Sequence, residues 1–308
     1  MAGVVALRRH RPEQGEGRNG RFESMYFRNH VRFRRRPLRW GRGAAQRAIP
    51  HLCLPLKLFD GCSTLLPLKI SIVIPAFNEE RLLGASLEQI KLAAGAFAEI
   101  GWDTEFIVCD NNSTDRTAEI ARSAGATVVF EPVNQIARAR NSGAAAATGD
   151  WLIFVDADSH PSAKLFSDVA EQILSGRCLA GGATIRLDEH HVVAETITWA
   201  WNCASRGLKL LAGSFIFCDA AAFRKIGGFS HELFAAEELE LSKRLKKLAR
   251  ETGKRIVILH RYPLVTSARK MRLYTAREHL RFLLRAVFNQ RRALSSREEA
   301  HLWYDGRR

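Results

Sequence analysis

The chain has 308 residues, of which 46% are hydrophobic, enough for the core of one large α/β domain or of two smaller domains. Its formal net charge of +15 would suit a nucleic-acid-binding protein, but the excess is concentrated near the N-terminus. Residues 1–69 carry 15 Lys and Arg against 4 Asp and Glu, whereas residues 70–308 carry 32 against 28. The main part of the chain is therefore close to electrical balance.

Residues 1–66 are rich in Arg and Gly and show no sustained period, which predicts a basic, disordered N-terminal extension. Its composition is similar to that of an organellar transit peptide, and a start codon assigned too early, with Met25 as a later start, is the alternative. No eighteen apolar residues run together, so we expect no membrane span. Six Cys without Cys-x-x-Cys spacing favour reduced, buried thiols in a cytosolic protein over zinc ligands or disulfides.

From residue 69 onward, β-branched apolar runs alternate with segments of helical periodicity. The predicted strands are KISIVIPAF (69–77), TEFIVCD (104–110), TVVFEP (127–132) and WLIFVDAD (151–158). The predicted helices span 78–97, 113–125 and 134–149, with Asn78 as N-cap of the first. Continuously apolar strands that alternate with helices predict an α/β fold, with a mostly parallel, doubly wound sheet and helices on both faces.

Polar side chains follow three of these strands, where ligands bind in parallel sheets. Asn78 and Glu79 follow the first strand, Asp110 and two Asn follow the second, and Asp156 and Asp158 end the fourth. For each group, capping or turn chemistry is the alternative interpretation. No Gly-x-Gly-x-x-Gly fingerprint follows the first strand, so we do not expect a nicotinamide dehydrogenase.

Asp156 and Asp158 stand on either side of the small residue Ala157, directly after the apolar run IFV. Residues two apart in extended chain point to the same side, so the two carboxylates are expected to converge on one cation. Hard oxygen ligands of this kind suit Mg²⁺ or Mn²⁺, which are held together with the phosphates of a substrate. The alternative is a polar turn at the end of a strand.

Five segments taken together resemble glycosyltransferase family 2, the nucleotide-sugar transferases of GT-A fold. They are SIVIPAFNEE, VCDNNSTDRTAEIA, ARARNSGAAAATGDWLIFVDADS, GSFIFCDAAAFRKIGGF and AAEELELSKRL, within residues 69–260. The resemblance implies a nucleotide pocket lined by Pro75, Asn78, Glu79 and Asp110, with Arg140 near the diphosphate. It also implies that Asp156 and Asp158 bind the metal and that Asp156 contacts the nucleotide sugar.

The Glu237–Glu238 pair stands where the family has Glu-Asp, so the resemblance implies that Glu238 is the catalytic base, with Glu237 as the other candidate. One base and one displacement would invert the anomeric centre. The Gln-x-x-Arg-Trp motif of processive synthases does not follow Glu238, which favours a soluble enzyme that adds one sugar. By the resemblance, the donor is UDP-linked. The acceptor is a glycan, a lipid-linked molecule or a small molecule, and residues 188–211 are expected to bind it.

The expected domain organisation is an extension at 1–66, a transferase domain at 67–265 and a basic amphipathic helical segment at 266–308. Within the transferase domain, residues 67–160 form the nucleotide half and residues 161–265 the acceptor half. Arg277, Arg281 and Arg285 fall in one helical row, so the last segment either lies on anionic membrane at the cytoplasmic face or packs on the core.

Three other functions fit parts of the sequence. A sugar-phosphate nucleotidyltransferase would share the sheet and the acidic motif, but should carry a Gly-rich, Arg-containing loop where this chain has AFNEE. A nucleic-acid-binding protein would act through the basic extension, although aromatic residues are sparse there, so nucleic acid is not the expected partner. A degenerate transferase would bind nucleotide without turnover, because Glu replaces Asp at the base position.

Overall fold

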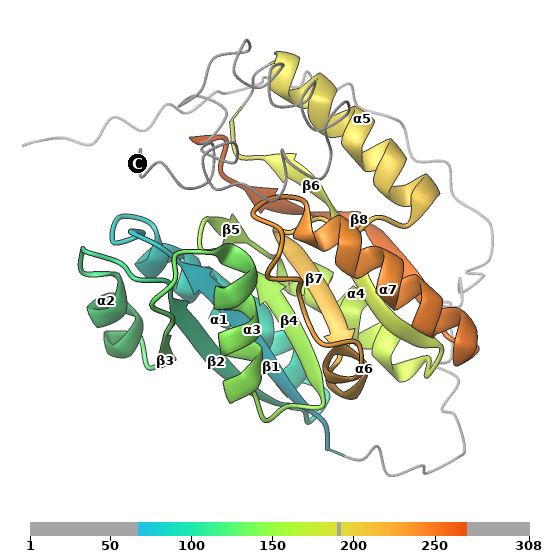
Figure 1. Cartoon of the computed structure of the whole chain (residues 1–308), viewed down its shortest axis with the longest axis horizontal. Coiled ribbons are helices and arrows are strands. Elements are labelled where there is room, and N and C mark those ends of the chain that lie inside the picture. The colour runs from blue at the N-terminus through green and yellow to red at the C-terminus, as the bar shows by residue number, and fades with distance from the viewer. Residues whose placement is uncertain (1–66, 190–191, 270–308) are drawn as a thin grey trace, which may run out of the picture. The chain divides into compact units, whose positions relative to one another are not determined.

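The computed structural model describes residues 67–189 and 192–269 (Figure 1). The predictions for the extension at 1–66 and for the segment that carries Arg277, Arg281 and Arg285 lie outside the described residues. No helix in the described part of the chain is long and apolar enough to span a membrane.

The described residues form an eight-stranded sheet with seven helices. The strands are β1 (Lys69–Ala76), β2 (Asp103–Asp110), β3 (Thr127–Phe130), β4 (Trp151–Val155), β5 (Ser159–His160), β6 (Cys178–Leu187), β7 (Phe215–Asp219) and β8 (Arg255–Thr266). The helices are α1 (Leu83–Ala98), α2 (Thr117–Ser123), α3 (Ile136–Ala146), α4 (Ala163–Leu174), α5 (Val192–Leu208), α6 (Ala220–Lys225) and α7 (Glu237–Glu251).

The strand order is β3-β2-β1-β4-β7-β6-β8-β5. The first four strands are parallel, which confirms the repeated strand–helix units predicted from the sequence. β7 runs antiparallel to both β4 and β6, β8 returns parallel to β6, and β5 pairs antiparallel with β8. The α/β fold class and the mostly parallel sheet are thus confirmed, with an antiparallel strand near the centre.

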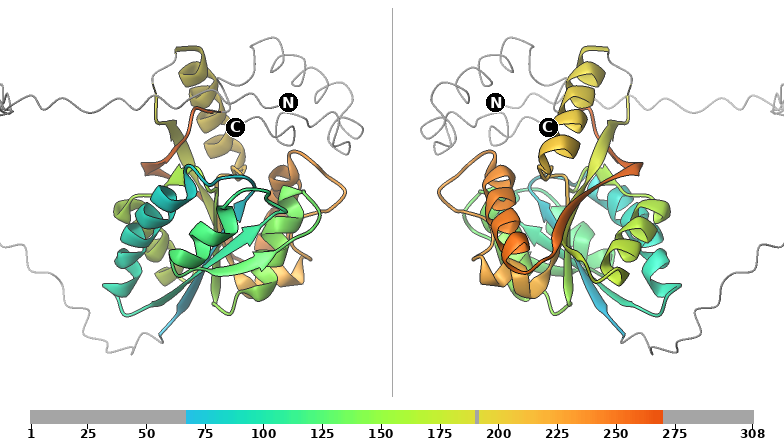
Figure 2. Two further views of the ribbon diagram at one scale, coloured as in Figure 1. Left: turned by 90° about the vertical axis from the view of Figure 1, so that its left-hand side faces the viewer. Right: turned by 90° about the vertical axis from the view of Figure 1, so that its right-hand side faces the viewer.

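Helices cover both faces of the sheet, as Figures 1 and 2 show. One apolar cluster joins α1, α2 and α4 to the sheet, and Phe97 of α1 stacks on Phe166 of α4 with ring centroids 5.1 Å apart. A second cluster on the other face includes α3, α6 and α7. There Phe154 of β4 packs edge to face with Phe229, at 5.3 Å between centroids. β4 is buried between the two clusters, so the residues that follow it are rigidly placed.

The Gly- and Ala-rich sequence of α3 has a packing reason. A Cβ atom added at Gly143 would lie 2.4 Å from Cγ1 of Val73 in β1, nearer than packed carbon atoms allow. The backbone of α3 therefore lies against the centre of the sheet, and this brings the preceding turn of the helix, with Arg140, close to the carboxyl end of β4.

The predicted start of the first helix was wrong, because α1 begins at Leu83 and its N-cap residue is Leu82. Asn78 instead adopts a left-handed conformation with φ of 53°. Its side-chain Oδ1 accepts a hydrogen bond from the backbone N–H of Thr114, at 2.8 Å. Asn78 thus joins the loop after β1 to the loop after β2, a tertiary role that helix-capping statistics do not reveal.

Candidate active site

The loops that follow β1 and β2 form one side of the candidate site. The ends of the strands are aligned, since Ala76 pairs with Asp110 and Asp110 pairs with Phe130. The backbone N–H of Glu79 donates to Thr117 Oγ1 at 2.8 Å, a second bond between the two loops. Asp110 is buried and its Oδ1 accepts from the N–H of Ser113 at 3.0 Å. The polar residues at this edge therefore hold the two loops together, as the turn interpretation expects.

Pro75 lies inside β1, opposite Cys109 of β2, and is buried. It stands in the strand end that leads into Asn78 and Glu79. Pro75, Asn78, Glu79 and Asp110, the residues expected to contact the nucleotide, are thus gathered at the carboxyl ends of β1 and β2.

Arg140 of α3 is the centre of a buried ion-pair network. Its side chain reaches Glu237 Oε1 at 2.6 Å, Asp156 Oδ1 at 3.0 Å and the carbonyl oxygen of Gly213 at 2.8 Å. The residue is 1% exposed. Burial opposes its charge, but the carboxylates of Asp156 and Glu237 outweigh burial, so the pKa of Arg140 lies above its ordinary value. The arginine therefore holds the loop after β4 against the start of α7.

A pocket of about 150 Å³ opens on this network, lined in part by Arg140, Asp156, Glu237 and Glu238. Both glutamates lie in the first turn of α7, where partial positive charge at the helix N-terminus favours anions. Glu237 is buried and engaged with Arg140, whereas Glu238 is half-buried. Burial and then the neighbouring Glu237 carboxylate raise the pKa of Glu238 to about 8. Glu238 is therefore a carboxyl group that can exchange a proton near neutral pH.

Asp156 and Asp158 do not lie in extended chain, so that part of the sequence prediction was wrong. β4 ends at Val155 and the chain turns at once, with the N–H of Ser159 bonded to the carbonyl oxygen of Asp156 at 3.0 Å. This turn, residues 156–159, is the acidic turn, and it lets β5 start at Ser159 and pair with β8. As a result, the Asp156 carboxylate meets Arg140, whereas that of Asp158 meets a different arginine, Arg269.

Arg269, which follows β8 by three residues, was not identified from the sequence. Its Nη2 lies 2.8 and 2.9 Å from the two carboxylate oxygens of Glu79 and 3.8 Å from Asp158 Oδ2. The backbone N–H of Ser267 also donates to the Asp158 carbonyl oxygen at 3.1 Å. No local motif marks this arginine, because only the return of β8 to the end of β4 brings it here.

The donor set suits a hard divalent cation bound together with a substrate. Within residues 67–189 and 192–269, no three His, Cys, Asp or Glu side chains converge as a complete metal site. Mg²⁺ and Mn²⁺ commonly use one or two carboxylates and take their remaining ligands from phosphates and water. Even without Glu238, which is largely protonated at neutral pH, the four carboxylates of Glu79, Asp156, Asp158 and Glu237 outnumber Arg140 and Arg269 and leave a surplus of negative charge.

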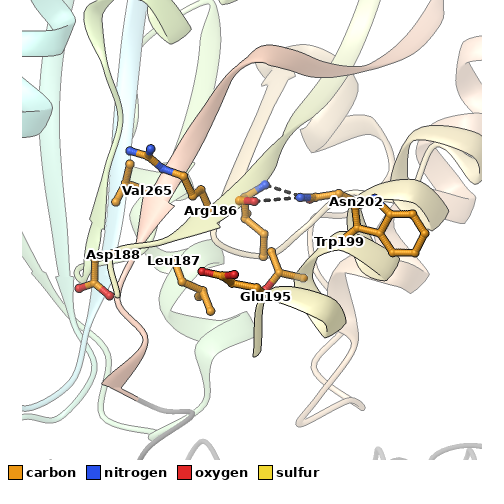
Figure 3. Close-up of a pocket in the computed structure, with 9 residues that line it drawn as sticks. Arg186, Leu187, Asp188, Glu195, Trp199, Asn202 and Val265 are labelled. Atoms are coloured by element: carbon orange, nitrogen blue, oxygen red, sulfur yellow. Dashed lines mark hydrogen bonds between the residues drawn. The ribbon is translucent and has the colours of Figure 1, made fainter. Parts of the chain in front are cut away.

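A larger pocket of about 500 Å³ lies between α5 and the ends of β6 and β8 (Figure 3). Trp199 of α5 lines it and is 68% exposed, while the side-chain amide of Asn202 bonds both the N–H and the carbonyl oxygen of Ile185. Val265 of β8 lines the same pocket and pairs with His160, two residues after Asp158. Asp188, Trp199 and Asn202 of this lining fall within the region 188–211, where acceptor binding remains a prediction.

Comparison with known proteins decides the family. Residues 71–223 match the family described as Glycosyl transferase family 2. The chain belongs to glycosyltransferase family 2. This family 2 chain is 34% identical over 113 residues to an uncharacterized glycosyltransferase of Mycobacterium tuberculosis, a match that covers 37% of the chain and 47% of the relative. It thus spans about half the length of that curated relative.

A second relative is glucosyl-3-phosphoglycerate synthase of Mycolicibacterium smegmatis, 37% identical over 97 residues, with 29% of the chain and 30% of the relative covered.

Two solved structures share the GT-A fold of this family 2 chain. TarS 1–349 of S. aureus aligns with a TM-score of 0.53 at 21% identity, covering 76% of the chain and 68% of TarS 1–349. Mannosyltransferase PcManGT of Pyrobaculum calidifontis, in complex with GDP-Man and Mn²⁺, aligns with a TM-score of 0.54 at 17% identity, covering 77% and 69%. At this level of identity, the likeness establishes the fold.

Proposed function

We propose that the chain is a glycosyltransferase that moves a sugar from a nucleotide-diphosphate sugar to an acceptor hydroxyl. The observation that carries the proposal is the pocket in which Arg140, Asp156, Glu237 and Glu238 meet at the carboxyl end of β4. Family membership supports it, as do similar folds whose structures contain a nucleotide sugar, UDP-GlcNAc in TarS and GDP-Man in PcManGT.

The donor nucleotide is proposed to lie over the ends of β1 and β2, contacted by Asn78, Glu79 and Asp110, and UDP is the proposed nucleotide. Pro75 shapes the backbone of this edge. Asp156 and Asp158 are proposed to hold Mg²⁺ or Mn²⁺ beside the diphosphate. When bound, the ion would neutralise the negative charge that develops on the leaving phosphate. Arg140 fixes Asp156 and Glu237 in place, so the acidic turn is positioned before a donor binds.

Glu238 is proposed to take the proton of the attacking hydroxyl. Glu237 is paired with Arg140 at 2.6 Å, whereas Glu238 lines the pocket with a pKa raised to about 8. A base is most effective when its pKa lies near the working pH, and such catalysis contributes roughly 10²–10⁴-fold. Attack on one side of the sugar and departure of the diphosphate on the other would give an inverted product.

The donor class is tested by thermal unfolding of the full chain with UDP, GDP, TDP or CDP, with and without Mn²⁺. Ligand at about 100 times its Kd stabilises the folded state by about 2.7 kcal/mol, so one nucleotide should raise the Tm only when Mn²⁺ is present. The matched control is the double variant Asp156→Asn, Asp158→Asn, which should lose the shift. If no nucleotide shifts the Tm of the unaltered chain, or if the variant responds equally, the proposed donor site is wrong.

A further inference from the structure

Arg269 lies against the acidic residues after β1 and β4, although in sequence it follows the end of β8. Its guanidinium binds both oxygens of Glu79, at 2.8 and 2.9 Å, and lies 3.8 Å from Asp158 Oδ2. The side chains of Glu79 and Asp158 are each 6% exposed and that of Arg269 is 16% exposed. Both carboxylates therefore lie against the same guanidinium, largely away from bulk water.

The contact with Asp158 is weaker than the contact with Glu79. The Glu79 distances are those of charge-assisted hydrogen bonds, whereas 3.8 Å to Asp158 is electrostatic proximity without a hydrogen bond. The Nε–H of Arg269 is buried and has no hydrogen-bond partner in the structure described. Glu79 thus anchors the guanidinium, and Asp158 is the partner that it can give up.

We propose that Arg269 is an internal counter-ion that occupies the Asp158 carboxylate in the donor-free enzyme and competes with a divalent cation for it. The inference rests on the proposed metal role of Asp156 and Asp158. A guanidinium beside Asp158 weakens the negative potential that attracts a cation, so the site binds metal weakly when no donor is present. The diphosphate of the donor adds negative charge and oxygen ligands, so the site binds metal more tightly once the donor is bound. Arg269 is therefore a positioning residue that couples metal binding to donor binding.

The test is a Mn²⁺ titration of the full chain followed by electron paramagnetic resonance, without nucleotide and with UDP. Arg269→Gln removes the charge, and Arg269→Lys keeps it. Arg261→Gln is the matched control, because Arg261 lies on β8 and contacts Asp168 and Glu171 of α4, at 3.5 Å, away from Glu79 and Asp158. Without nucleotide, Arg269→Gln should bind Mn²⁺ roughly tenfold more tightly than the unaltered chain, about one pK unit of interaction. Arg269→Lys and Arg261→Gln should stay close to the unaltered chain.

The Mn²⁺ affinity of Arg269→Gln decides whether Arg269 is a counter-ion. Unchanged or weaker Mn²⁺ binding by Arg269→Gln overturns the counter-ion role, and UDP-dependent Mn²⁺ binding by the unaltered chain would then leave the proposed function standing. If neither the unaltered chain nor any of the three variants binds Mn²⁺ even with UDP, the proposed metal role of Asp156 and Asp158 fails together with the inference. Loss of folding cannot imitate the expected result, because an unfolded variant would not gain affinity for Mn²⁺.

Discussion

Replacing Glu238 by Gln is expected to lower kcat/KM by about 10²–10⁴-fold, the usual contribution of a general base. Gln has nearly the same shape but cannot accept the proton of the acceptor hydroxyl. Because the nucleotide is proposed to be held by Asn78, Glu79, Asp110 and the metal at Asp156 and Asp158, and not by Glu238, nucleotide binding should change little. The measurement is steady-state release of nucleoside diphosphate, together with nucleotide-induced thermal shift.

The matched control is Glu240→Gln, a neutralisation in the same first turn of α7. Glu240 is paired with Arg244 and is not among the residues that line the pocket. Its activity should stay within about twofold of the unaltered chain, since surface pairs contribute little. Equal losses in the two variants, or full activity in Glu238→Gln, would remove Glu238 from the mechanism.

The pH dependence follows from the same carboxyl group. Since only ionised Glu238 can act as a base, kcat/KM should rise with pH through about 8, and Glu238→Gln should lack this rise.

The raised pKa of Glu238 also affects stability, because between the two pKa values the folded state holds a proton that the unfolded state has lost. The contribution of Glu238 to the free energy of unfolding is fully present below its ordinary pKa of 4.5 and is lost as the pH rises through about 8. Urea unfolding at several pH values would show it.

Replacing Arg140 by Ala should lower the free energy of unfolding by about 3–5 kcal/mol, the usual cost of removing one partner from a buried ion pair. The change leaves the carboxylates of Asp156 and Glu237 and the carbonyl oxygen of Gly213 without the cation that bonds them. A second change, Glu237→Gln in the same chain, removes one of the stranded charges and should recover part of the loss.

Urea denaturation of the full chain measures both effects. Arg261→Ala serves as the comparison, because its side chain is 61% exposed and its ion-pair distances are 3.5 Å, so it should cost less than about 1 kcal/mol. A cost for Arg140→Ala no larger than that of Arg261→Ala would show that the buried network does not hold the acidic turn.

The sequence predicted the first half of the fold well because local pattern decides it. Continuously apolar strands such as β1 and β4 alternate with helices that have apolar faces, and that alternation implies parallel pairing. The direction of β7 was not predicted, because a short apolar run such as FIFCD looks the same in a parallel and an antiparallel strand.

For the site, local sequence indicated the carboxylates but not their cationic partners or their exact geometry. Asp156 and Asp158 follow a recognisable apolar run, whereas Arg140 and the Glu237–Glu238 pair entered through the family resemblance. Arg269 acts across 190 residues of chain from Glu79, and no spacing rule connects them. The turn at Asp156 was only the alternative interpretation, because it depends on pairing between β5 and β8, which is a tertiary contact.

The configuration of the product shows whether the reaction is a single displacement assisted by Glu238 beside the acidic turn. Nuclear magnetic resonance spectra recorded early in the reaction of the full chain with a UDP sugar and Mn²⁺ report the anomeric centre of the first product. This centre is expected to be inverted relative to the donor. A product that retains the donor configuration would contradict the single displacement and the role assigned to Glu238.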